Sequence, residues 1–161
     1  MQIVVMGVSG AGKSVIGRAL AAQLSFPYID GDDLHPAANI AKMRSGVPLD
    51  DDDRAPWLER VGTWLAQHTQ GVVSCSALRR RYRDRLREAA PGARFVQLNV
   101  DTERLTQRLS ARRGHFMPGS LLASQLSAFE PLTPDEHGVL LDNDGGTPDE
   151  IAARAVELLR R

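Results

Sequence analysis

Three aspartates and a histidine lie within six positions near the start of the chain, in the stretch "YIDGDDLHP" at residues 28–36. They follow a short apolar run that is typical of a strand. Asp30 and Asp32 are two residues apart, so both would face one site if the strand continued. Carboxylates in this arrangement could hold a metal ion, orient a substrate hydroxyl, act as a base or cap the next helix.

A second stretch with chemical potential reads "GVSGAGKS" and has the G-x-x-x-x-G-K-[ST] spacing, between an apolar run and an amphipathic one. Its glycines let the backbone approach a polyphosphate, and successive N–H groups form a nest for the anion. The following helix adds the positive end of its dipole. We expect Lys13 to reach the β- and γ-phosphates and the Ser14 hydroxyl to bind Mg²⁺. The predicted nucleotide-binding residues of the loop are Gly7, Val8, Ser9, Gly10, Ala11, Gly12, Lys13 and Ser14.

The elements that must position these residues follow from the alternation of apolar and amphipathic runs. Strand, then helix, repeated along the chain predicts an α/β fold: a five-stranded parallel sheet between two layers of helices, in a single domain over 1–161. Ligands in such sheets bind at the carboxyl ends of the strands, which is where the acids lie. Strands are predicted at 2–6, 26–30, 71–76, 94–100 and 138–143, and helices at 13–24, 36–46, 53–68, 102–113, 121–129 and after Thr147.

The sequence "TPDE" occurs twice. At 147–150 it supplies a helix N-cap, a proline at the first helical position and a glutamate three residues after the cap, so a helix is expected there. At 133–136 we expect only a turn, because Gly138 and a predicted strand follow.

Composition narrows the class of protein. The 161 residues carry no net charge, which argues against nucleic acid or an anionic membrane as a partner. No apolar run approaches the roughly 18 residues of a membrane span, and no signal peptide is recognisable. Cys75 is the single cysteine, so no internal disulfide can form, as expected in a reducing cytoplasm. It lies in an apolar run and is expected to be a small buried hydrophobe.

Other proteins with a phosphate loop differ from this chain in two respects. A GTPase would need a guanine-specifying N-K-x-D stretch, which is absent from the sequence. Many ATPases place an aspartate after the strand beside the loop, whereas here "GVVSCS" at 71–76 ends in serines. The acids after the second predicted strand are therefore the best candidates for the magnesium function. Size, and the glycine- and proline-containing break at 114–120, favour a small-molecule kinase.

Four blocks extend the comparison over almost the whole chain: "MGVSGAGKS", "DGDDLHPAANIAKMRSGVPLDDDDRAPWL", "CSALRRRYRDRLR" and "ARRGHF". Together they resemble gluconokinases of the small phosphate-loop type, which are related to shikimate kinase. The departures are conservative, since Arg79 and Arg113 stand where lysine is frequent. The resemblance implies a fold like that of nucleoside monophosphate kinases, with a lid near 113–130. It also implies transfer of phosphate from ATP, with Mg²⁺, to O6 of D-gluconate, in a cytoplasmic and commonly dimeric enzyme.

The acids then divide into roles. By resemblance, Asp30 orients the magnesium ion through water and Asp32 contacts the acceptor hydroxyl, as a base or only to orient it. For Asp33 we favour a helix cap. His35 precedes a proline, which favours an extended conformation, and either contacts gluconate or fixes the loop.

For two basic residues of this region, Arg54 and Lys42, the sequence leaves two roles open. The acids at 50–53 should repel an acidic substrate and are expected to cap the next helix. Arg54 has a planar fork that suits a carboxylate, and is a substrate ligand or the partner of a nearby aspartate. Lys42 contacts the substrate or is solvated. Ser76, Arg80 and Arg83 follow the third predicted strand and are expected to contact the substrate.

Further roles are implied by the resemblance in the region of the lid. Arg108 would stack on adenine. Arg112, or Arg113, would neutralise charge on the transferring phosphoryl group. His115 could contact gluconate. The turn at 145–148 would border the adenine. The alternatives to gluconokinase are a kinase of another small acid such as shikimate, a nucleotide kinase, and a nucleotide-dependent switch.

Overall fold

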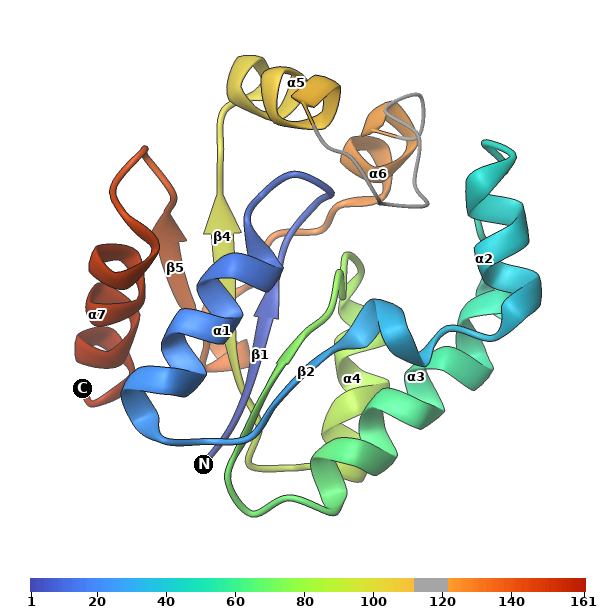
Figure 1. Cartoon of the computed structure of the whole chain (residues 1–161). Coiled ribbons are helices and arrows are strands. Elements are labelled where there is room, and N and C mark those ends of the chain that lie inside the picture. Colours follow the sequence, from blue (N-terminus) through green and yellow to red (C-terminus); the bar gives the residue numbers. More distant parts are fainter. Residues whose placement is uncertain (112–121) are drawn as a thin grey trace.

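The computed structural model describes residues 1–111 and 122–161, with side chains described outside 108–121. Strands and helices alternate along these ranges, and two short 3₁₀ helices interrupt the connections (Figure 1). The strands are β1 (Gln2–Met6), β2 (Tyr28–Asp30), β3 (Gly71–Ser74), β4 (Arg94–Asn99) and β5 (Val139–Asp142). The helices are α1 (Lys13–Leu24), η1 (Gly31–Leu34), α2 (Ala37–Arg44), α3 (Asp51–Ala66), α4 (Arg80–Ala89), α5 (Thr102–Ala111), α6 (Leu122–Ala128), η3 (Pro134–Glu136) and α7 (Pro148–Leu159).

The strands form one parallel sheet in the order β2-β3-β1-β4-β5. This confirms the predicted five-stranded α/β fold. The chain crosses from β1 to β2 on one side and from β3 to β4 on the other, so the order reverses next to β1. A crevice at the carboxyl ends of the strands is expected at such a reversal. The phosphate loop, α2, α5 and α6 all lie toward this end of the sheet (Figure 1).

Two apolar layers hold the helices to the sheet. Helices α1 and α7 cover one face, where Ile16, Leu20 and Ile151 are buried. Helices α3 and α4 cover the other face, where Leu65 and Leu86 are buried. The parallel strands contribute apolar residues to both faces, as their short apolar runs predict. In the described ranges, no helix has the length and apolar character needed to cross a membrane.

Local signals fix the start of α3. Asp50 accepts a hydrogen bond from the Asp53 N–H, and the Asp53 side chain accepts one from the Asp50 N–H, which forms a capping box. The capping role predicted for these acids is thus confirmed, and the helix begins two residues before the predicted start. The turn predicted at 133–136 is wrong in detail: a second capping box, between Thr133 and Glu136, forms the 3₁₀ helix η3.

Candidate active site

The phosphate loop joins β1 to α1 with a backbone that requires glycine. Gly10 and Gly12 have φ angles of 84° and 95°, in the left-handed region that side chains disfavour. A Cβ on Gly7 would lie 3.1 Å from the Leu98 carbonyl oxygen. Lys13 Nζ donates to the Val8 carbonyl at 3.0 Å, so the ammonium group folds back over the loop. The arrangement is the one a polyphosphate nest needs.

Two residues outside the loop support it from neighbouring strands. The buried Asn143, just after β5, donates from Nδ2 to the Ala11 carbonyl at 2.9 Å. The buried Ser74, at the end of β3, donates from Oγ to the Lys13 carbonyl at 2.7 Å and accepts from the Tyr28 hydroxyl at 2.9 Å. Each side chain satisfies a backbone carbonyl of the loop or the first helical turn. The loop is therefore held rigid from both sides.

The first aspartate of the D-G-D stretch faces this loop directly. Ser14 Oγ donates to Asp30 Oδ2 at 2.6 Å, and Asp30 Oδ1 accepts from the Asp32 N–H at 3.0 Å. Asp30 thereby caps the 3₁₀ helix η1. The expectation that Asp33 is the cap is wrong: Asp33 is exposed, and α2 begins after Pro36 with no side-chain cap.

The glycine between the two acids is a steric requirement. Asp30 pairs with Ser74 across the sheet, which brings Gly31 against the end of β3. A Cβ on Gly31 would lie 2.5 Å from the Ser74 carbonyl oxygen. Trp57 on α3 donates from Nε1 to the Gly31 carbonyl at 2.8 Å. The chain turns tightly here, and this turn directs the two acids to the same cleft.

A cleft of about 910 Å³ opens at this edge of the sheet. Gly7, Val8 and Ala11 are buried inside the loop and do not line it. Most of the other predicted site residues do. Those with described side chains or backbone in the cleft wall are Ser9, Gly10, Gly12, Lys13, Ser14, Asp30, Asp32, His35, Arg54 and Ser76.

His35 is buried in the cleft wall and held on two sides. Its ring stacks on Trp57 with 4.2 Å between centroids. Asn39 Nδ2 donates to the Asp53 carbonyl at 2.8 Å and lies 3.1 Å from His35 Nδ1. Because this amide nitrogen is a donor, Nδ1 accepts and the ring proton is on Nε2. Burial and the nearby Arg54 lower the pKa of His35 to about 4, so the ring is neutral at pH 7.

His35 and Arg54 both line the cleft and are both held by protein contacts. His35 fixes the turn before α2 and also lines the cleft. Among the described residues, Arg54 forms no ion pair with the neighbouring acids; its Nη1 donates to the Leu49 carbonyl at 2.6 Å and to the Tyr82 hydroxyl at 3.1 Å. Lys42, in contrast, does not line the cleft: its exposed ammonium group pairs with Asp53 at 2.7 Å.

A polar cluster built around Tyr82 joins α3 to α4 at the cleft. The Tyr82 hydroxyl donates to Asp51 Oδ1 at 2.6 Å, and Arg81 Nη2 lies 2.8 Å from Asp51 Oδ2. Arg54 and Arg81 each lie over the Tyr82 ring, at 5.1 and 5.3 Å from its centroid. Hydrogen bonds from Tyr82 and Arg81 lower the pKa of Asp51. Burial and the bond to Asp51 raise the pKa of Tyr82, which therefore stays a hydroxyl.

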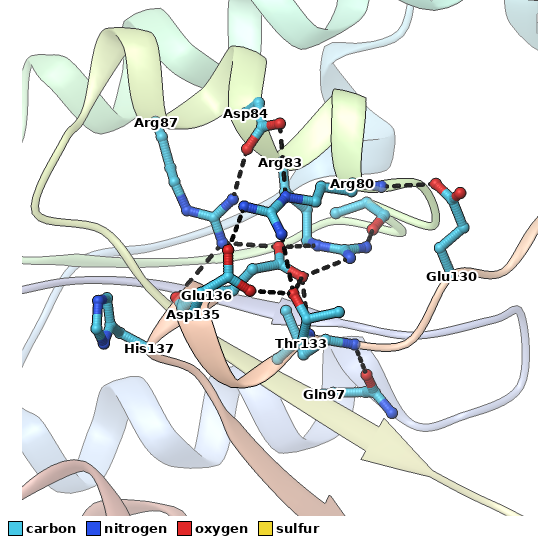
Figure 2. A network of polar contacts seen from close by, with 12 residues as sticks. Arg80, Arg83, Asp84, Arg87, Gln97, Glu130, Thr133, Asp135, Glu136 and His137 are labelled. Atoms are coloured by element: carbon cyan, nitrogen blue, oxygen red, sulfur yellow. Dashed lines mark hydrogen bonds and ion pairs between the residues drawn. The ribbon is translucent and has the colours of Figure 1, made fainter.

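Arg80 and Arg83 do not contact the cleft, which corrects the prediction that they bind the substrate. Arg83 is fully buried and forms a two-pronged ion pair with Glu136, with Nε at 2.7 Å and Nη2 at 2.9 Å (Figure 2). Arg80 Nη2 pairs with Asp135 at 2.6 Å (Figure 2). Both arginines thus join α4 to η3, outside the cleft wall.

The network around Glu136 is complete. Arg87 Nη2 also reaches Glu136, at 2.9 Å (Figure 2). Burial pushes the pKa of Glu136 up, but hydrogen bonds from Arg83, the Thr133 N–H and Arg87 outweigh it and hold the pKa at about 2. Among the described residues, no buried side-chain nitrogen or oxygen lacks a partner. The carboxylate is therefore charged and satisfied in the interior.

Several residues of the cleft were not found from the sequence. Gln125 on α6 accepts from the Ser9 N–H at 2.6 Å, so a side chain from within the predicted lid region contacts the phosphate loop. Helical periodicity alone gives no signal for such a contact. Arg79 and Arg81 also line the cleft. The signal in the sequence is their position: both lie near the start of the helix that follows β3, and so near the carboxyl end of that strand.

Four of the predicted residues lie outside the part of the chain whose side chains are described: Arg108, Arg112, Arg113 and His115. Their roles stay predictions. The turn after β5 does border the cleft, through Asn143, Gly146 and Pro148. Cys75 is buried, and its burial raises the pKa of the thiol to about 12, as expected for a small core residue.

Comparison with known proteins agrees with this architecture. The shikimate kinase family model matches residues 9–160. The thermosensitive gluconokinase of Escherichia coli strain K12 is 43% identical, over 98% of this chain and 88% of the relative. A crystal structure of a gluconokinase from Sinorhizobium meliloti 1021 shares 49% identity with a TM-score of 0.90, over 99% of this chain and 91% of that chain. A shikimate kinase from Bacteroides thetaiotaomicron has a TM-score of 0.70 at 20% identity, over 100% and 99% of the two chains, and shares the fold. The chain therefore belongs to the shikimate kinase family and, within it, to the gluconokinases.

Proposed function

We propose that this protein transfers the γ-phosphoryl group of ATP to the C6 hydroxyl of D-gluconate, giving 6-phospho-D-gluconate and ADP. The observation that carries the proposal is the gluconokinase likeness over nearly the whole chain, together with a phosphate loop that faces the Asp30–Asp32 edge across one cleft. The cleft has room for both a nucleotide and a sugar acid.

Nucleotide and acceptor enter from different walls of the cleft. We expect the loop amides and Lys13 to receive the phosphates, and Asn143 and Gly146, which also line the cleft, to border the opposite end of the nucleotide. Asp32, His35 and Arg54 also line the cleft, and we assign them to the acceptor. In-line transfer needs the acceptor hydroxyl to approach the γ-phosphorus opposite the leaving oxygen. The two walls meet at Asp30 and Asp32, so this is where we place the transferring group.

Magnesium fits the oxygen atoms at this point. Ser14 Oγ and Asp30 Oδ2 are 2.6 Å apart, and both are hard oxygen donors next to the phosphate nest. Mg²⁺ usually keeps several waters and substrate phosphates as ligands, so one or two protein oxygens can hold it. When bound, Mg²⁺ supplies charge neutralisation of the phosphate oxygens. Ser14 and Asp30 would hold it, Asp30 directly or through water.

Asp32 is proposed to orient the C6 hydroxyl and to receive its proton. The transition state of phosphoryl transfer is loose, so little proton removal is needed before the bond to phosphorus forms. Orientation is then the larger contribution. Neutral His35 carries its proton at Nε2 and can donate to an oxygen of the sugar acid. Arg112 would neutralise the transferring group, and Arg108 would stack on adenine.

A coupled assay of ADP release tests the function. The panel contains D-gluconate, other aldonates, shikimate and no acceptor, each with ATP and Mg²⁺. We expect release with gluconate well above the rate without acceptor, and formation of 6-phosphogluconate. Release only with shikimate or another acid would assign a different acceptor. Slow release that no acceptor accelerates would assign a nucleotide-dependent switch instead.

We further propose that the protein works in the cytoplasm as a homodimer, as the resemblance implies. The single buried cysteine suits a reducing compartment. Light scattering after size-exclusion chromatography tests the dimer: a mass near twice 17.6 kDa is expected, and a mass of one chain would contradict it.

A further inference from the structure

Gluconate carries a carboxylate at the end of the chain opposite C6, and the cleft must neutralise it. Several cationic side chains line the cleft. Lys13 folds over the phosphate loop, and Arg18 lies over the Tyr28 ring. Arg54 donates to Leu49 and Tyr82, and Arg81 pairs with Asp51. Each of these cations is engaged by the protein.

Arg79 differs from the others. Its side chain is half-buried in the cleft wall, and within the described ranges it forms no ion pair, hydrogen bond or ring contact. A guanidinium group that is partly removed from water loses solvation, which an anion restores. Pairing the group with a substrate anion is the simplest way to compensate that cost in this cleft.

The backbone of Arg79 is fixed from both sides. The Glu130 N–H donates to the Leu78 carbonyl at 2.7 Å, and Glu130 Oε1 accepts from the Arg80 N–H at 2.9 Å (Figure 2). Glu130 thus bridges the two residues that flank Arg79. Arg79 is itself the N-cap residue of α4, with extended backbone angles of φ −109° and ψ 146°. The side chain therefore leaves from a held point of the backbone.

The position of Arg79 places it on the acceptor wall. It follows β3, the strand that pairs with β2, whose end carries Asp30. It is also close in the chain to Arg81 and Tyr82, which contact α3, the helix that carries Arg54. The phosphates already have the amide nest and Lys13. An anion near Arg79 is therefore more simply a group of the acceptor.

We propose that Arg79 binds the carboxylate of the acceptor and makes the enzyme select an aldonate over a neutral polyol. The planar fork can hold both carboxylate oxygens, and a lysine would hold them as a point charge only. This assignment rests on the proposed function. It transfers to Arg79 the carboxylate-binding role that the sequence suggested for Arg54, whose Nη1 is already engaged by Leu49 and Tyr82.

The test compares two acceptors that differ only in charge: D-gluconate and D-gluconamide. Calorimetry with the full chain and MgADP gives the dissociation constant of each, for the wild type, Arg79→Gln and Arg79→Lys. In Arg79→Gln we expect gluconate to bind about tenfold more weakly or worse, because a charged hydrogen bond is lost. Gluconamide binding and MgADP binding should stay within about twofold, and Arg79→Lys should fall between.

The matched control is Arg85→Gln, an exposed arginine on the same helix that is outside the cleft. It should leave all three dissociation constants unchanged. Equal weakening of gluconate and gluconamide in Arg79→Gln would overturn the proposal, as would weakening of MgADP or no change. The proposed function fails separately, if wild-type protein shows no gluconate-dependent release of ADP.

Discussion

The arginines in and next to helix α4 lie in two environments, which differ in burial and in the partners they offer the guanidinium groups. On the side facing η3, Arg83 is completely buried, and both it and Arg87 are bonded to Glu136. At the cleft, Arg79 has no partner among the described residues, and Arg81 pairs with an exposed aspartate. The same residue type thus stabilises the fold on one side and is available to a ligand on the other.

The difference distinguishes arginines whose charge stabilises the fold from an arginine whose charge can bind a ligand. A fully satisfied buried pair has no donor left for a ligand, and removing one partner leaves a charge without solvation. A half-buried cation without a partner contributes little to stability, and its removal should be tolerated by the fold. Stability and ligand affinity should therefore respond to different arginines of one helix.

The largest expected effect is on stability and comes from breaking the buried ion pair between Arg83 and Glu136. Glu136→Gln removes the charge that compensates Arg83, and should lower the free energy of unfolding by about 3–5 kcal/mol. Urea denaturation followed by circular dichroism measures it. Asp84→Asn, which alters exposed pairs of the same helix with Arg80 and Arg87, is the control and should cost less than about 1 kcal/mol. Equal losses in the two variants would contradict the comparison.

Lowering the pH tests the role of the Glu136 carboxylate without a mutation. The pKa of Glu136 is about 2 in the fold against 4.5 for an ordinary glutamate, so its ionisation stabilises the fold above about pH 4.5. As pH falls from 4.5 through 2, a contribution of about 3 kcal/mol should be lost. Denaturation curves at several pH values measure it, and Glu136→Gln should flatten this part of the profile. An unchanged slope in the variant would assign the acid sensitivity to other groups.

On the cleft side, the largest expected effect is on rate. Asp32→Asn removes the carboxylate proposed to orient the acceptor hydroxyl, and kcat should fall about 100-fold, or about 2.7 kcal/mol. Binding of MgADP, measured by calorimetry, should be unchanged. The adjacent exposed residue provides the control, Asp33→Asn, which should keep normal activity. Normal kcat in Asp32→Asn would remove its assigned role.

Tyr82 connects the two helices at the cleft, and its hydroxyl can be removed alone. Tyr82→Phe deletes the bonds to Asp51 and Arg54 and keeps the ring under both guanidinium groups. We expect kcat/KM for gluconate to fall about fivefold, since about 1 kcal/mol of hydrogen bonding is lost. Steady-state kinetics with varied gluconate measures it. Tyr28→Phe, which alters the support of the phosphate loop, should leave KM for gluconate unchanged.

Much of this architecture could be predicted from the sequence because its signals are local. Loop spacing predicted the nucleotide site, and the alternation of apolar runs predicted the sheet. The arginines of α4 could not be assigned in the same way. Arg80, Arg83 and Arg87 recur at helical spacing, so the sequence predicts that they share a face. The sequence does not say which face turns inward, because the partners lie far along the chain: Arg80 pairs with Asp135, and Glu136, which binds Arg83 and Arg87, comes 49 residues after Arg87.

The capping residue at the D-G-D stretch was missed for a related reason. Propensity alone does not distinguish Asp30 from Asp33 as a cap. The choice is made by Gly31, which has no room for a side chain against the Ser74 carbonyl, and by Ser14, which holds Asp30 in place. Both contacts join segments that are distant in sequence, so no local pattern reveals them.

Ser74 ends the strand after which many phosphate-loop ATPases place an aspartate, and its contacts bear on how this site can evolve. It contacts Lys13 and Tyr28, it is aligned with Asp30, and a Cβ on Gly17 would lie 2.4 Å from its hydroxyl oxygen. A change to aspartate would therefore add a second negative charge beside Asp30 and a larger group against α1. These positions constrain one another and can change only as a set. The placement of the acid on β2 is thus difficult to reverse by single mutations, and descendants of this protein should retain it.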